Sequence, residues 1–220
     1  MLPSRSPRSR RSRSGRHAGS GYASFTHVNR RTLAASAPAR GTLLNWAWSF
    51  YLLLAVAGIL WLGLRHGEIG LGWFVGEKWL ADLGLGLLTG GLMSGAWVVG
   101  RRSLREARRI EEYFAAVLGG LTGSEALALA VLSAIAEEFF FRGAVQDAWG
   151  FLAAAGLFTF LHVGPGREFR LWTLFAGIAG LVLGGLMMWR GTLLAPMIAH
   201  ALVNAIGLSR LAALSPAAEE

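Results

Sequence analysis

The chain has 220 residues, of which 54% are hydrophobic and 15% are charged, a composition that excludes an ordinary soluble domain and indicates that lipid surrounds much of the chain. Its net charge of +8 belongs to residues 1–40, which contain nine of the 21 basic residues and no acidic residue, so that 12 basic and 13 acidic residues remain elsewhere. The absence of cysteine excludes disulfides, thiolate metal ligands and cysteine nucleophiles.

Residues 1–40 are rich in arginine and serine and carry few large apolar side chains. Such a segment buries too little surface to offset the entropy of ordering, so we expect a disordered tail. A cytoplasmic arm that binds anionic lipid and a transit peptide share this composition. No nucleic-acid partner is expected, because the tail has no folded basic module and no interleaved aromatic residues.

Residues 41–100 are expected to form two transmembrane helices. Residues 43–64 are 22 uncharged residues, enough to cross a hydrocarbon core of ~30 Å at ~1.5 Å per residue. A second span is expected at residues 79–100, where GLLTG (86–90) and GLMSG (91–95) have the small-xxx-small spacing that lets helices pack closely.

The charged segment 101–123 is predicted to be amphipathic and to lie at the cytoplasmic membrane surface. Residues 101–114 contain five arginines and three acidic residues, a pattern typical of an interfacial helix. Together with the basic tail, this segment places the N-terminus and residues 101–114 in the cytoplasm and the loop 65–78 outside, by the positive-inside rule.

Residues 124–210 are expected to form a helical core, followed by a C-terminal tail at residues 211–220. Ser124 is a candidate N-cap because Glu125 falls in the first helical turn after it. Further spans are expected at residues 124–147, 149–163, 171–189 and 192–208. With no alternating strand pattern, the sequence predicts an all-α membrane protein, a bundle of about six transmembrane helices with its active site inside the helical core.

Three charges lie inside the apolar helix predicted at residues 124–147: Glu137, Glu138 and Arg142. A charge at the centre of a membrane helix costs ~2.5–3.5 kcal/mol, so these groups are expected to face the bundle interior. Glu138 and Arg142 are four residues apart and share a helix face, which predicts an ion pair. Glu137 lies about 100° around the helix from Glu138, so it is left without this partner and is free to take part in chemistry.

Further polar groups in apolar helices are His162, His200 and Asn204. Together with Glu137 they form a candidate active site. A buried carboxylate suits a general base that takes a proton from water, and an imidazole with a carboxamide suits stabilisation of an oxyanion. The set Glu137, His162 and His200 also matches the ligands of one divalent metal ion, most closely zinc, and a metal-free mechanism is the alternative. Either arrangement predicts hydrolysis.

These residues fall in three motifs, EExxxR, FxxxH and HxxxN/D, and the chain resembles the CPBP intramembrane proteases over residues 124–208. That family includes the CAAX prenyl endopeptidases of the Rce1 type and bacteriocin-processing and immunity proteins. The resemblance implies that Glu137 activates water, that His162 holds it, and that His200 with Asn204 stabilises the oxyanion. Glu138, Arg142 and Phe158 would support them, and the family has been described both as metalloprotease and as glutamate-dependent.

The predicted function is therefore that of an intramembrane endopeptidase with a peptide or membrane-protein substrate. A catalytically silent scaffold or immunity protein of the same fold is the first alternative, and a proton-coupled transporter is the second. The short chain has no paired discontinuous helices or repeat symmetry, which counts against a transporter. The composition indicates a multi-pass protein of the bacterial inner membrane in contact with lipid, and it leaves the oligomeric state open.

Overall fold

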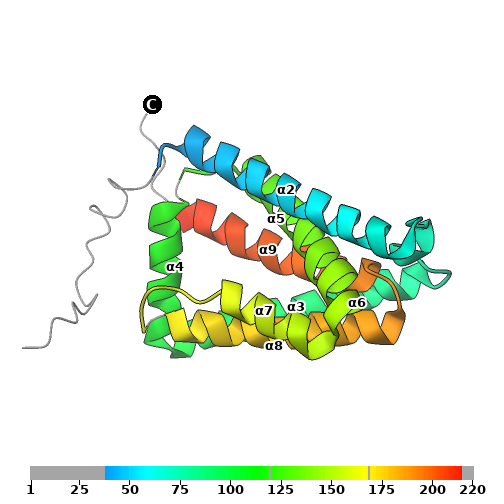
Figure 1. Cartoon of the computed structure of the whole chain (residues 1–220). Helices are drawn as coiled ribbons and strands as arrows, with labels where there is room; N and C mark the ends of the chain where they lie inside the picture. The colour runs from blue at the N-terminus through cyan, green and yellow to red at the C-terminus, as the bar shows by residue number, and fades with distance from the viewer. Residues whose placement is uncertain (1–37, 119, 168, 215–220) are drawn as a thin grey trace, which may run out of the picture.

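A computed structural model describes residues 38–118, 120–167 and 169–214. Most of the predicted N-terminal tail and residues 215–220 of the predicted C-terminal tail lie outside the described residues. Across the three described ranges, the regular structure consists of helices and contains no strand (Figure 1). The predicted all-α helical bundle is confirmed.

Six helical segments follow the six predicted spans closely, and several extend beyond the predicted bounds. They are α2 (Arg40–His66), α3 (Trp79–Ser103), the segment that begins with α5 (Gly123–Glu138), α7 (Phe151–Leu161), α8 (Phe169–Arg190) and α9 (Leu194–Leu214). Four of them, α2, α3, α8 and α9, are long and apolar enough to cross a membrane. In the described part of the chain, α7 is shorter, and the segment that begins with α5 carries three of the buried charged side chains: Glu137, Glu138 and Arg142.

The helix predicted at residues 124–147 is continuous but changes its winding. The α-helix α5 passes into a π-helix, η2 (Phe139–Val145), and then into the short α6 (Gln146–Trp149). Gly150, with φ of +88°, separates α6 from α7 and adopts a conformation that glycine tolerates better than other residues. π-Helical turns inside α-helices are frequently found at functional sites.

The start of α5 corrects one prediction, because Thr122 and not Ser124 is the N-cap. The Thr122 hydroxyl accepts a hydrogen bond from the Glu125 amide at 3.3 Å, and the Glu125 carboxylate accepts one from the Thr122 amide at 2.8 Å. This reciprocal capping box satisfies two backbone donors, whereas a cap at Ser124 would satisfy one.

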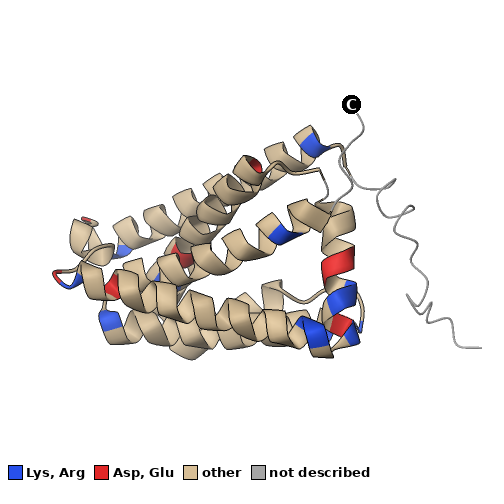
Figure 2. Cartoon of the chain, turned by 180° about the vertical axis from the view of Figure 1, so that it is seen from behind, with Lys and Arg blue, Asp and Glu red and all other residues tan. Residues whose placement is uncertain are grey.

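The charged segment after α3 forms α4 (Arg105–Val117), which lies across one end of the bundle, near the start of α2 and the end of α9 (Figure 1). Its buried face carries Ala107, Ile110 and Glu111, and Glu111 pairs with Arg101 at 3.0 Å. Basic residues gather at this end of the molecule, with acidic residues among them (Figure 2). An amphipathic helix at this position is what the sequence predicted.

Small residues decide how closely α3 approaches α9. A Cβ atom at Gly86 would lie 2.7 Å from Ile198, and one at Gly90 would lie 2.6 Å from the Ala199 carbonyl oxygen. Glycines 91 and 95 of the second predicted motif have no atom within 4 Å of such a Cβ. The GLLTG motif is therefore a packing motif, and the GLMSG motif is not.

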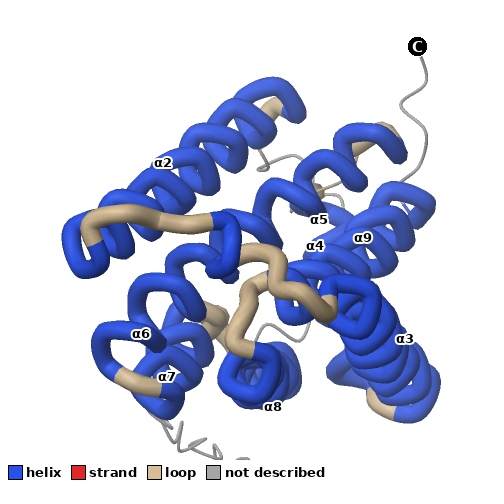
Figure 3. Tube along the Cα trace, turned by 90° about the vertical axis from the view of Figure 1, so that its right-hand side faces the viewer, coloured by secondary structure: helices blue, strands red, loops and turns tan. Residues whose placement is uncertain are grey.

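The α5 helix lies between α2 and α9 and packs against both, while α9 also packs against α3 and α7 packs against α8. Figure 3, viewed along the bundle, shows α2 and α8 on opposite sides of this arrangement. The helix α2 approaches η2 closely at two glycines. At Gly58 of α2, an added Cβ would lie 3.0 Å from the Phe139 backbone, and Gly143 of η2 contacts the buried Leu62 of α2. These contacts hold α2 against the helix that bears the glutamates.

Candidate active site

The bundle contains a partly open cavity of about 320 Å³, and four predicted site residues line it: Glu137, His162, His200 and Asn204. They come from α5, the end of α7, and α9. The remaining wall is mostly apolar and includes an aromatic group formed by Trp97, Phe114, Trp172 and Phe175. The structure therefore brings the predicted polar residues to one cavity with largely apolar walls.

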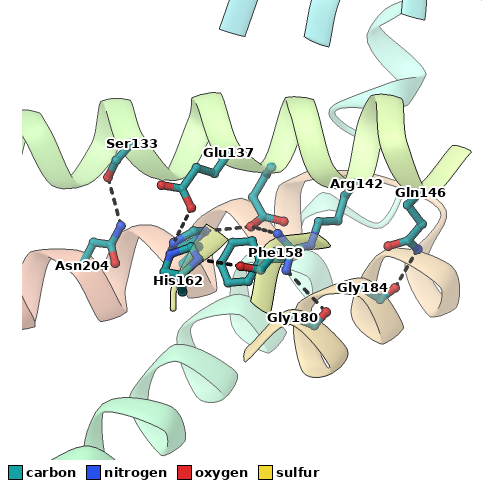
Figure 4. Close-up of polar contacts among 11 residues, drawn as sticks. Ser133, Glu137, Arg142, Gln146, Phe158, His162, Gly180, Gly184 and Asn204 are labelled. Atoms are coloured by element: carbon teal, nitrogen blue, oxygen red, sulfur yellow. Dashed lines mark hydrogen bonds and ion pairs between the residues drawn. The ribbon is translucent and has the colours of Figure 1, made fainter. Parts of the chain in front are cut away.

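Glu138 links two of the predicted residues in the interior. One of its oxygens, Oε1, lies 3.0 Å from Arg142 Nη1 and 2.7 Å from His200 Nδ1. Glu138 and Arg142 are fully or almost fully buried, and the Arg142 Nη2 also donates to the Gly180 carbonyl at 3.4 Å (Figure 4). The predicted ion pair is present, and it also fixes the ring of His200.

Glu137 has a different environment from its neighbour. Its side chain is buried, and its Oε2 lies 3.9 Å from His200 Nε2. This oxygen has no hydrogen-bond partner among the described atoms. Figure 4 shows the Glu137 carboxylate directed from α5 toward the histidines. Glu137 therefore presents a carboxylate oxygen to the cavity while Glu138 is held by a cation.

His162 and Phe158 lie at the end of α7. The His162 Nδ1 is 2.7 Å from the Phe158 carbonyl oxygen, and the two rings stack with centroids 4.3 Å apart. The Phe158 ring also lies 4.6 Å from the guanidinium carbon of Arg142 and edge-on to the His200 ring at 6.1 Å. Phe158 thus packs between both histidines and the buried arginine, which restricts the rotamers of all three.

Two residues at the cavity were missed by reasoning from the sequence. Tyr51 of α2 lines the cavity, with its hydroxyl close to the Glu137 carboxylate. Ser133 of α5 accepts a hydrogen bond from Asn204 Nδ2 at 3.0 Å. The spacing of Ser133, one helical turn before Glu137, was a signal in the sequence that could have identified it.

The predicted metal ligands do not gather into a coordination sphere. No group of three His, Cys, Asp or Glu side chains within the described ranges is arranged to hold a metal ion. The Nδ1 atom of His200 is occupied by Glu138, and that of His162 by the Phe158 carbonyl. These bonds leave Nε2 of each ring available, as in most histidine metal sites, so the predicted metal set stays a prediction and the chemistry below is derived for the side chains alone.

Comparisons with known proteins cover the segment that carries Glu137, His162, His200 and Asn204. Residues 120–206 match the family described as Type II CAAX prenyl endopeptidase Rce1-like, which confirms the predicted resemblance for that segment. The chain is also similar to the "Uncharacterized protein YpbD" of Bacillus subtilis (strain 168), with 36% identity over 80 residues, which cover 36% of this chain and 41% of that protein. The similarity thus spans less than half of either chain. No solved structure matches.

Proposed function

We propose that this membrane protein, whose residues 120–206 are Rce1-like, is an endopeptidase that hydrolyses a peptide bond inside the bilayer with water activated by Glu137. The observation that carries the proposal is the pairing of two adjacent carboxylates with different partners. Glu138 is bound through Oε1 by Arg142 and His200, whereas Glu137 lines the cavity and is not paired with an arginine. A carboxylate that is not neutralised by arginine is free to accept a proton.

In the proposed reaction, the oxygen of a water molecule attacks the carbonyl carbon of the scissile peptide bond. Glu137 takes the proton that the water loses and then delivers it to the departing amine, so that the carboxylate is regenerated. The Nδ1–H of His162 is directed at its own helix, which leaves Nε2 as an acceptor that can hold the water. The tautomers follow from these hydrogen-bond partners.

His200 and Asn204 would stabilise the oxyanion that forms when water adds to the carbonyl. The Glu138 carboxylate can only accept, so His200 donates to it from Nδ1, and a second donor at Nε2 for the oxyanion requires the ring to carry a proton on both nitrogens. The Asn204 amide supplies a second donor from the same helix. Donors fixed in advance at a developing negative charge are effective because they need no reorganisation during the reaction.

The apolar wall of the cavity supports a substrate that is a peptide or a membrane-protein segment embedded in lipid. Its aromatic side chains would exclude bulk water around the reacting groups. The basic end of the bundle at α4 supports a cytoplasmic location for that end, by the positive-inside rule. We place the protein in a bacterial inner membrane with the N-terminus in the cytoplasm.

The test is proteolysis of a membrane-peptide library by detergent-purified wild type and Glu137→Ala, each with and without a strong chelator. Exposed Glu77, in the loop before α3, provides a matched control as Glu77→Ala. We expect cleavage by wild type and by the control, no cleavage by Glu137→Ala, and no effect of the chelator.

Equal cleavage by Glu137→Ala would refute the proposed base. A folded wild type that cleaves no member of the library would favour a silent scaffold. Proton flux that depends on Glu137 in vesicles would favour the transporter. The proximity of Glu137 and His200 around one cavity counts against a relay extended along the membrane normal.

A further inference from the structure

The helices α5 and α9 run in opposite directions and face each other through two pairs of polar side chains. Glu137 lies opposite His200, and one turn away Ser133 lies opposite Asn204. Figure 4 shows Ser133 and Glu137 pointing from α5 toward α9. Ser133 is 3% exposed and lines the same cavity as the other three residues. It is therefore close to the reacting groups without belonging to the predicted motifs.

The hydrogen bonds of Ser133 determine whether its hydroxyl donates to Asn204 or accepts from it. A serine hydroxyl carries a single proton, and that of Ser133 is donated to the Ala130 carbonyl at 3.1 Å. Toward Asn204 the hydroxyl oxygen is left as an acceptor, 3.0 Å from Nδ2. The amide of Asn204 must therefore turn its NH₂ group, and not its carbonyl oxygen, toward Ser133. With the hydroxyl proton on the Ala130 carbonyl, only the NH₂ orientation of Asn204 pairs a donor with this acceptor, and that orientation is assigned from the hydrogen-bond partners.

We propose that Ser133 is a positioning residue that fixes the amide orientation of Asn204, a role that rests on the proposed oxyanion function of Asn204. The Nδ2 atom has two protons, and Ser133 takes one of them. The second proton remains available for an oxyanion in the cavity. If the amide were inverted, its carbonyl oxygen would occupy the position of Nδ2 and repel the developing negative charge.

The test compares Ser133→Ala with Ser133→Thr, which retains the hydroxyl and can make the same bond to the preceding turn. The control is Ser94→Ala, which removes another buried hydroxyl from the same cavity, one that has no hydrogen-bond partner within the described structure. Loss of one hydrogen bond predicts that Ser133→Ala lowers kcat about two- to tenfold. KM should not change, because the oxyanion forms only in the transition state.

Ser133→Thr should restore kcat, and Ser94→Ala should leave it at the wild-type value. An unchanged kcat in Ser133→Ala would overturn the proposal, as would an equal loss in Ser94→Ala. A rise in KM without a fall in kcat would also overturn it.

A thermal double-mutant cycle tests the contact without any need for activity, and it also serves if the extra methyl group of threonine is not accommodated. Ser133→Ala, Asn204→Ala and the double variant are unfolded in the same detergent. If the two side chains depend on each other, the double variant should unfold close to the temperature of the single variants. Additive shifts in Tm would overturn the proposal. If the wild type is inactive but the Tm shifts of the cycle are non-additive, the proposed protease is refuted while the contact between Ser133 and Asn204 is supported.

Discussion

Two buried ionic clusters in this bundle are built from similar residues but differ in the partners of their carboxylate oxygens. The outer cluster, which we define as Asp82, Arg190 and Thr192, lies at the end of the bundle opposite α4. Both carboxylate oxygens of Asp82 are engaged, Oδ1 by the Arg190 Nε and Oδ2 by the Thr192 hydroxyl at 3.1 Å. This cluster ties α3 to the turn between α8 and α9.

The cavity cluster, defined as Glu137, Glu138, Arg142 and His200, satisfies only one of its two carboxylates with a cation. Arg142 compensates Glu138, and Glu137 faces the cavity. The comparison shows that a buried charge by itself does not identify an active site. A buried carboxylate that lines a cavity and is not paired with an arginine is the more specific sign.

The largest effect on stability is expected from Arg142→Met. Removing one partner of a buried ion pair leaves an uncompensated charge, which costs about 3–5 kcal/mol. Thermal unfolding in detergent measures this loss of stability, with Arg109→Met on the exposed face of α4 as the control. The control should change stability by less than about 0.5 kcal/mol. Equal Tm values for the two variants would show that the Glu138–Arg142 pair does not hold the cavity cluster together.

A smaller loss is expected where α3 packs against α9, the interface that positions both clusters. Gly90→Ala places a Cβ against the Ala199 carbonyl and should cost about 1–3 kcal/mol through overpacking. Gly91→Ala adds the same methyl group to an open position and is the matched control. Unfolding curves in which both variants lose the same stability would contradict the close α3–α9 contact.

The smallest effect is expected from Tyr51→Phe, which removes the hydroxyl that reaches Glu137 from α2. Loss of one polar contact predicts a fall in kcat of about two- to tenfold with little change in Tm. Tyr113→Phe on α4 removes a tyrosine hydroxyl from outside the cavity lining and serves as the control. If both variants retain wild-type kcat in peptide cleavage assays, the Tyr51 hydroxyl of α2 does not contribute to catalysis.

Much of the cavity cluster could be predicted from the sequence because charges are costly in apolar helices. Three charges in one such helix must face inward, and the spacing of Glu138 and Arg142 already specified their pair. The helical spans were predictable for the same reason, since long uncharged stretches admit few other structures in lipid. The π-helical turn after Glu138 has no comparable signal in the sequence.

Tyr51 and Ser133 could not be assigned with the same arguments. Tyrosine and serine are ordinary residues in membrane helices: the spacing of Ser133 places it on the face of Glu137, but only the tertiary packing shows what Ser133 and Tyr51 contact. Tyr51 reaches Glu137 because Gly58, two turns further along α2, allows close approach to η2. The Ser124 cap was mispredicted because the capping box between Thr122 and Glu125 was overlooked.

The most direct test of the distinction between the clusters is to measure kcat and Tm for Glu137→Gln and Asp82→Asn side by side. Glu137→Gln should lower kcat by about 10²–10⁴-fold, the range expected for a general base, and leave Tm near the wild-type value. Asp82→Asn should keep kcat and lower stability by about 1–3 kcal/mol, because Arg190 loses its charged partner. Wild-type kcat in Glu137→Gln would contradict the account, whatever the stability of Asp82→Asn.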